Sequence, residues 1–99
     1  MRVISHKRLV DAAKNRPGAA DAIDRWYRIA KRADWRSIHD VRRVFPTADP
    51  VGEFTVFNLS GNQYRLITVI RYTQHNIFID SVLTHREYDE WSRRQRAKK

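Results

Sequence analysis

The chain has 99 residues, enough for one domain with a modest core, and it is strongly basic, with 20 lysines and arginines against 11 aspartates and glutamates and a formal net charge of +9. It has no cysteine, which excludes disulfide bonds, thiolate metal sites and cysteine nucleophiles. The N-terminus lacks the apolar core of a signal peptide, and the apolar runs fall far short of the roughly 20 residues that span a bilayer, so we expect a soluble, cytoplasmic protein with no membrane contact.

The chain is predicted to open with one short strand and a helix. Residues 2–5 have the character of a strand, and Ser5 is a candidate cap for the helix that follows. Arg16, Pro17 and Gly18 end this helix, because proline and glycine both resist helical continuation.

Two further helices are expected before the middle of the chain. Apolar residues recur on one helical face from 19 to 33, with acidic residues early and basic residues late, which complements the helix dipole. A short third helix is expected from Ser37, its candidate cap, to Val44, and Pro46 stops it. The stretch 47–52 is a loop by composition.

The second half changes to the periodicity of strands. Residues 53–59, 63–72 and 76–83 are rich in β-branched and aromatic side chains, and the short joints between them permit only antiparallel neighbours. Thr84 then caps a final helix, with Glu87 three residues later completing a capping box.

This order, β-α-α-α-β-β-β-α, predicts an α+β fold, a largely antiparallel sheet with helices packed on one face. A single domain spans residues 1–99. Its last part, residues 93–99, is a charged tail that we expect to be frayed.

The predominance of arginine among the basic residues predicts a polyanionic partner. Fifteen of the 20 cations are arginine, whose planar guanidinium binds phosphate through two hydrogen bonds and stacks on bases. A genome rich in G and C is an alternative reason for arginine over lysine, but it does not explain the excess of cations over anions. We therefore expect a surface that attracts nucleic acid.

Two strand arginines are candidates for that surface. In a strand, alternate side chains share a face, so Arg65 and Arg71 point away from Tyr64, Leu66 and Ile70. We expect the second set to face the helices and the two arginines to lie on the open face as part of an anion-binding surface. The alternative is that these arginines only keep an exposed sheet surface soluble.

His85 and Tyr88 stand at the start of the final helix. An imidazole titrates near neutral pH and can move protons, and a tyrosine can stack on a base or stabilise developing charge. The alternatives are a surface histidine and a core aromatic residue that anchors the helix.

The remaining candidates are less specific. Arg42 and Arg43 belong to a cluster on the third helix that is either a phosphate-contacting stripe or a solvated basic face. The other histidines have no ligand-type spacing to one another or to His85, so we expect no metal site and no cofactor.

Two segments of the second half carry a known motif in this order and spacing. They are Val56-Phe57-Asn58 followed by Gly61-Asn62-x-Tyr64-Arg65-Leu66, and Leu83-Thr84-His85-x-Glu87-Tyr88-Asp89. On these residues the chain resembles the HigB-type branch of the RelE-like toxins over essentially its whole length. The resemblance implies a RelE-like domain and an mRNA interferase, a metal-free endoribonuclease that commonly cuts messenger RNA in the ribosomal A site.

The resemblance also implies a chemistry, in which the ribose 2′-hydroxyl attacks the adjacent phosphate and the enzyme supplies a base, an acid and positive charge. By resemblance Arg65 stabilises that charge, Tyr88 corresponds to the tyrosine of the last helix, and His85 falls where relatives carry a basic or proton-transferring residue. Relatives also use lysines on the second strand, which this chain lacks between Lys31 and Lys98. The base is therefore His85 first, with His75 or Tyr88 as substitutes.

The predicted site thus has Arg65, His85 and Tyr88 at its centre. The expected substrate-binding residues around them are Arg71, Tyr72, His75, Arg86, Arg42 and Arg43. The resemblance implies mRNA and the ribosome as partners, a helix-turn-helix antitoxin of the HigA type, and operator DNA only through the complex with that antitoxin. The main alternative is a non-catalytic RNA-binding module, and a weaker one is a transcription partner that binds DNA.

Overall fold

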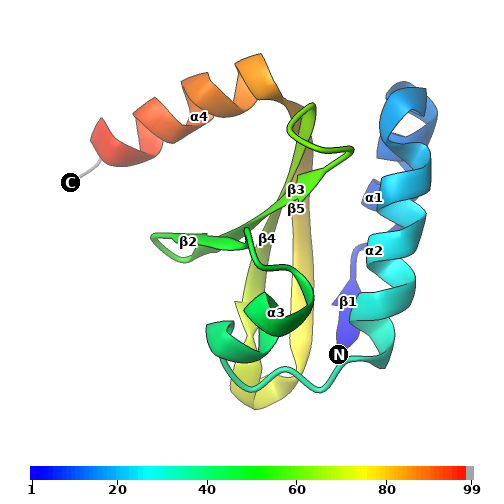
Figure 1. The fold of residues 1–99 in the computed structure, drawn as a ribbon, viewed down its shortest axis with the longest axis vertical. Coiled ribbons are helices and arrows are strands. Elements are labelled where there is room, and N and C mark those ends of the chain that lie inside the picture. The colour runs from blue at the N-terminus through cyan, green and yellow to red at the C-terminus, as the bar shows by residue number, and fades with distance from the viewer. Residues whose placement is uncertain (98–99) are drawn as a thin grey trace.

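A computed structural model describes residues 1–97 and has one five-stranded sheet with helices on both sides of it (Figure 1). The elements in chain order are β1 (Arg2–Ile4), α1 (His6–Asn15), η1 (Pro17–Ala19), α2 (Ala20–Arg32), α3 (Ile38–Val44), β2 (Asp49–Val51), β3 (Phe54–Leu59), β4 (Tyr64–Arg71), η2 (Tyr72–Gln74), β5 (Asn76–Thr84) and α4 (His85–Ala97), where η marks a single 3₁₀ turn. The α+β class and the predicted order are confirmed. The structure adds one strand, β2, inside the stretch that composition assigned to a loop.

The strand order is β1-β5-β4-β3-β2. β3, β4 and β5 form the expected antiparallel meander, β2 adds to the β3 edge in antiparallel fashion, and β1 pairs with β5 in parallel. Two parallel strands cannot be joined by a tight turn and need a long connection. β1 and β5 are the first and last strands of the chain, and the connection between them contains α1, α2, α3 and the other three strands. The sheet is therefore largely antiparallel, as predicted.

The main core lies between the sheet and the first three helices, of which α1 and α2 run along one side of the sheet (Figure 1). Trp26 of α2 is 1% exposed and meets Phe57 of β3 edge to face, with ring centroids 5.3 Å apart. Leu66 and Ile70 of β4 join the same cluster. Replacing Trp26 or Phe57 with alanine would cost about 3–5 kcal/mol of folding free energy, so this cluster contributes strongly to the stability of the packing between α2 and the sheet.

The final helix packs on the opposite face of the sheet. Trp91 of α4 forms a second cluster with Val56 and Ile67, and its ring meets that of Phe54 at 5.2 Å. Val56 and Ile67 each neighbour a residue of the main core in sequence, so they point away from that core. The prediction of helices on one face therefore describes α1, α2 and α3, and α4 covers one end of the other face.

A bulge in β5 keeps both halves of that strand aligned with the core. The pairing with β4 shifts between Ile67 and Thr68, so that Ile67 pairs with Ser81 and Thr68 with Ile79, which leaves Asp80 unpaired. Because of this extra residue, Ile79 and Val82 both reach the main core although they are three apart.

The three predicted cap residues stand directly before their helices, but only Thr84 makes a side-chain cap bond. Thr84 and Glu87 form the predicted capping box, with Thr84 N–H donating to Glu87 Oε1 at 2.8 Å and Glu87 N–H donating to Thr84 Oγ1 at 3.2 Å. Ser5 instead adopts a left-handed conformation, with φ of 69°, and its side chain makes no cap bond. The Ser37 side chain also makes none, and the carboxylate of Asp40 accepts a bond from the backbone N–H of Arg36 at 3.0 Å.

The predicted frayed tail is helical as far as the structure describes it. α4 continues through Ala97, and residues 98–99 lie outside the described residues. Within residues 1–97, no helix has both the length and the apolar character that a membrane crossing requires.

Candidate active site

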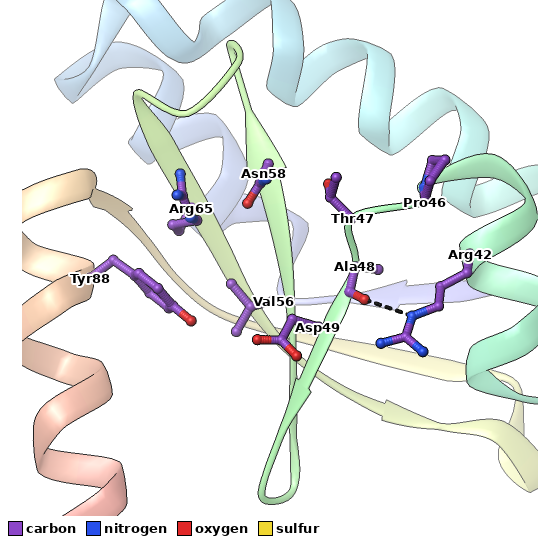
Figure 2. A pocket seen from close by; sticks show the side chains of 9 residues that line it. All are labelled: Arg42, Pro46, Thr47, Ala48, Asp49, Val56, Asn58, Arg65 and Tyr88. Atoms are coloured by element: carbon purple, nitrogen blue, oxygen red, sulfur yellow. Dashed lines mark hydrogen bonds between the residues drawn. The ribbon is translucent and has the colours of Figure 1, made fainter.

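A cleft with a volume of about 540 Å³ lies on the face of the sheet that α4 partly covers, between α4 and the segment that follows α3 (Figure 2). Its lining comes from α3, the α3–β2 connection, β2, β3, β4 and α4, and consists of Arg42, Pro46, Thr47, Ala48, Asp49, Val56, Asn58, Arg65 and Tyr88. Segments far apart in sequence thus contribute two guanidinium groups, a phenol, a carboxylate and an amide to one cleft.

Arg65 lies on the face of β4 that the sequence predicted. It pairs across the strands with Asn58, and both line the cleft. Its Nη1 donates hydrogen bonds to the backbone carbonyls of Asn62 at 2.9 Å and Tyr64 at 3.2 Å. These bonds use one nitrogen of the guanidinium, so the planar fork keeps two further nitrogens with which to bind a phosphate.

Tyr88 forms the wall of the cleft on the α4 side. Its ring stacks on Trp91, with centroids 5.7 Å apart, and Trp91 is itself 8% exposed in the second cluster. The guanidinium of Arg65 lies 5.3 Å from the centre of the Tyr88 ring, which is a cation–π distance. Tyr88 is therefore both an aromatic residue that anchors α4, which was the alternative interpretation, and a cleft residue. Its hydroxyl is directed across the cleft (Figure 2).

Arg42 lies on the side of the cleft opposite α4, and Asp49 lies between Arg42 and Tyr88 (Figure 2). The Nε of Arg42 donates to the carbonyl of Ala48 at 3.0 Å, which holds the guanidinium beside this buried residue directly before β2. Asp49 is the next residue, and it pairs in the ladder with Val56. The backbone on either side of the Asp49 carboxylate is therefore held in place.

Sequence reasoning missed Asp49 and Asn58 as cleft residues. Asn58 stood inside the first of the two motifs, which was a usable signal, and its Nδ2 donates to Asn62 Oδ1 at 3.3 Å. Asp49 stood in a stretch that was interpreted as a loop, so no periodicity indicated where its side chain would point.

His85 lies at the start of α4 but outside the cleft lining. Its backbone N–H donates to the Gln63 carbonyl at 3.0 Å, and its exposed ring places Nδ1 3.2 Å from the carboxylate of Asp89. Arg86 is also exposed, and it stands two residues before Tyr88. Because positions two apart on a helix do not share a face, Arg86 does not join Tyr88 in the cleft lining.

The first turn of α4 is held by a cluster of hydrogen bonds around Glu87. The bond from the Thr84 backbone N–H, helped by the nearby Arg16 guanidinium at 2.6 Å, lowers the pKa of the Glu87 carboxyl below its ordinary value. This carboxylate ties α4 both to its own cap and to the end of α1, and so it helps to hold Tyr88 against the sheet.

Three of the predicted substrate-binding residues lie at the far end of β4. Arg71 is six residues from Arg65, which is about 20 Å along a strand. Tyr72 packs against the main core, where burial is the largest cause of its raised pKa. His75 adopts a left-handed backbone with φ of 57°, and its Nδ1 is 3.3 Å from the Asp34 carboxylate. The fold therefore separates these residues from the cleft.

The cleft combines two guanidinium groups, which are able to bind a phosphate, with a phenol and a carboxylate, which are able to exchange protons. Of the two predicted arginines on α3, Arg42 lines it and Arg43 is exposed outside the lining. In the described part of the chain, no three histidine, aspartate or glutamate side chains gather as metal ligands do.

Comparison with known proteins places the chain beside bacterial toxins over most or all of its length. Residues 19–91 match the model of a family described as HigB_toxin, the RelE-like toxic component of a toxin–antitoxin system. The chain is 28% identical to an mRNA interferase HigB of Escherichia coli O6:H1, with 100% of this chain and 99% of the relative covered. It is 27% identical to the mRNA interferase toxin HigB of Escherichia coli K12, with 99% and 97% covered, and equally similar to an mRNA interferase HigB of Shigella flexneri.

Proposed function

Because the chain belongs to the HigB family of RelE-like toxins, the toxic components of toxin–antitoxin systems, we propose that it is an endoribonuclease that cleaves messenger RNA. The relatives named mRNA interferase align with it over nearly their whole length. The observation that carries the proposal is the cleft in which Arg65 lies 5.3 Å from the Tyr88 ring and shares the lining with Arg42.

The proposed reaction is attack of a ribose 2′-hydroxyl on the adjacent phosphate. Arg65 and Arg42 bind the phosphate and stabilise the charge that develops on it, and Tyr88 gives a proton to the departing 5′-oxygen. Since the substrate supplies the nucleophile, the step needs no metal to activate water. The sequence predicted His85 as the base, but this residue, at the start of the same helix as Tyr88, lies outside the cleft lining, so the proposed reaction does not assign it that role.

The partners follow from the family and the charge. A toxin of this class is held inactive by its antitoxin, and we propose one of the helix-turn-helix HigA type, which would contact operator DNA on behalf of the complex. An acidic segment covering the basic surface would bind less tightly as salt rises. The net charge of +9 also supports action in the cytoplasm on ribosome-bound message, because the ribosome is a large polyanion.

Induced expression tests the proposal directly. The wild-type chain should arrest growth and leave cut ends in a chosen transcript, detected by primer extension, and co-expression of the neighbouring reading frame should restore growth. Arrest without cut ends would contradict the nuclease proposal, and no rescue by either flanking frame would contradict the pairing with an antitoxin.

A non-catalytic RNA-binding module is the second candidate, because the same basic cleft would also hold RNA without cutting it. The two differ in single-turnover experiments on programmed ribosomes. A protein that co-sediments with ribosomes but leaves a defined message intact would support the binding module.

A further inference from the structure

We propose that Asp49 is the general base of the cleft, the group that takes the proton from the attacking 2′-hydroxyl. This inference rests on the proposed nuclease function and assigns the role that the sequence gave to His85. It comes from the side chains that the fold brings together in the cleft, to which β2 contributes Asp49.

The chemistry of the lining leaves one group suited to accept a proton. Guanidinium groups such as those of Arg42 and Arg65 have no acceptor site, and the phenol of Tyr88 already has the role of the acid in the proposed reaction. Amides and alkyl hydroxyls are very weak bases, and the other side chains of the lining are apolar. Among the cleft residues, the carboxylate of Asp49 is therefore the base.

The position of Asp49 suits this role. Its backbone is fixed by pairing with Val56, and its side chain enters the cleft between Arg42 and the hydroxyl of Tyr88 (Figure 2). Asp49 is exposed, and within residues 1–97 it forms no salt bridge. A carboxylate without a partner of its own is available to hydrogen-bond a substrate hydroxyl.

The charges around Asp49 make a carboxylate compatible with a phosphate substrate. Arg42 of α3, Arg65 of β4 and the Tyr88 phenol of α4 line the cleft together with Asp49. Asp49 also borders a neighbouring hollow, whose other charged residues are Glu53 and Arg96, one of each sign. The two guanidinium groups outnumber the single carboxylate, so the cleft still attracts a phosphate. His85 lies outside this group, with its Nδ1 beside Asp89.

The step is a balanced proton transfer coupled to phosphoryl transfer. The 2′-oxygen forms a bond to phosphorus while its proton passes to a carboxylate oxygen of Asp49. The bond between phosphorus and the 5′-oxygen breaks, and that oxygen takes the Tyr88 proton. The products are a 2′,3′-cyclic phosphate and a free 5′-hydroxyl, and exchange with water restores both side chains.

The test compares Asp49→Asn with Asp11→Asn, a matched control that removes one negative charge from an exposed position on α1, across the sheet from the cleft. Single-turnover cleavage of a defined message at saturating protein is measured with ribosome co-sedimentation and thermal unfolding. Asp49→Asn should cleave about 10²–10⁴-fold more slowly, the usual effect of losing general acid–base catalysis. Binding should be as tight or tighter, because a negative charge has left an RNA-binding cleft. Asp11→Asn should cleave like the wild type.

Two further measurements separate the base from a structural role. Asp49→Glu, which keeps a carboxylate, should cleave faster than Asp49→Asn. The wild-type rate should show no acid limb in the range near pH 6.5 where imidazoles ordinarily titrate, and His85→Gln should leave the profile unchanged.

Four results would overturn the assignment. Two concern Asp49→Asn: cleavage at the wild-type rate, or a loss of cleavage matched by a loss of binding or of folding. The other two are an Asp49→Glu rate no higher than that of Asp49→Asn, and an acid limb of the wild-type pH profile in the imidazole range that His85→Gln abolishes. Absence of cleavage by the wild type would instead overturn the nuclease function itself, so the two failures are distinguishable.

Discussion

Replacing Arg65 with alanine is the sharpest test of the cleft, because this side chain has both a structural and a proposed chemical role. Its Nη1 bonds the Asn62 and Tyr64 carbonyls, and its guanidinium lies over the Tyr88 ring. Losing these partly exposed contacts costs about 1–3 kcal/mol of folding free energy. A domain typically has about 5–15 kcal/mol of stability, so we expect the variant to remain mostly folded.

The expected loss of activity is larger than the folding loss can explain. Removing one preorganised donor to a developing anionic charge typically slows the chemical step about 10²–10³-fold, or 2.7–4 kcal/mol. A folding loss that leaves most molecules native changes the measured rate little. The cleavage rate therefore reports on the chemistry, provided that the folded fraction is measured by thermal unfolding on the same sample.

Arg71→Ala is the matched control for this variant. Arg71 is an exposed arginine on the same strand, about 20 Å away, and its removal changes the net charge by the same amount. At saturating protein we expect Arg71→Ala to cleave at the wild-type rate. Cleavage at the wild-type rate by folded Arg65→Ala would refute the reasoning. An equal loss of cleavage in Arg65→Ala and Arg71→Ala would also refute it, because it would indicate a general effect of charge on RNA binding.

Three other predictions follow from the same geometry. Tyr88→Phe removes the proposed acid but keeps the stack on Trp91, so cleavage should fall about 10²–10⁴-fold with an unchanged unfolding midpoint; a wild-type rate would exclude the hydroxyl from the reaction. EDTA should leave cleavage unchanged on a message whose own structure needs no metal, and a requirement for added divalent metal at the chemical step would contradict substrate-assisted attack. The lowered pKa of Glu87 means that its ionised form stabilises the fold, so the stability advantage of the wild type over Glu87→Gln, measured by denaturant unfolding, should be complete at neutral pH and disappear as pH falls through that lowered value. A difference independent of pH would indicate that the charge of Glu87 has no such effect.

Short-range physics made much of the fold predictable from sequence. The capping box of Thr84 and Glu87 joins residues three apart, and the amphipathic face of α2 repeats every three to four residues, so both patterns act within one element. The alternation along β4 likewise separated Arg65 from Leu66 before any neighbouring strand was known. Ser5 and Ser37 stand at the predicted cap positions, but their side chains make no cap bond. Ser5 has a left-handed backbone, and at Ser37, whose backbone is extended as a cap requires, the residue type alone did not ensure the bond.

The tertiary structure decided which residues share the cleft. β2 exists because residues 49–51 find an edge of β3 to pair with, and this long-range pairing is what fixes Asp49 opposite Val56. The length of β4 separates Arg71 and His75 from Arg65, although the sequence grouped them by chemical type. Periodicity gives the face on which a side chain lies. Only the packing of α3, β2 and α4 around the sheet brings Arg42, Asp49 and Tyr88 together, because that packing depends on contacts between residues far apart in the chain.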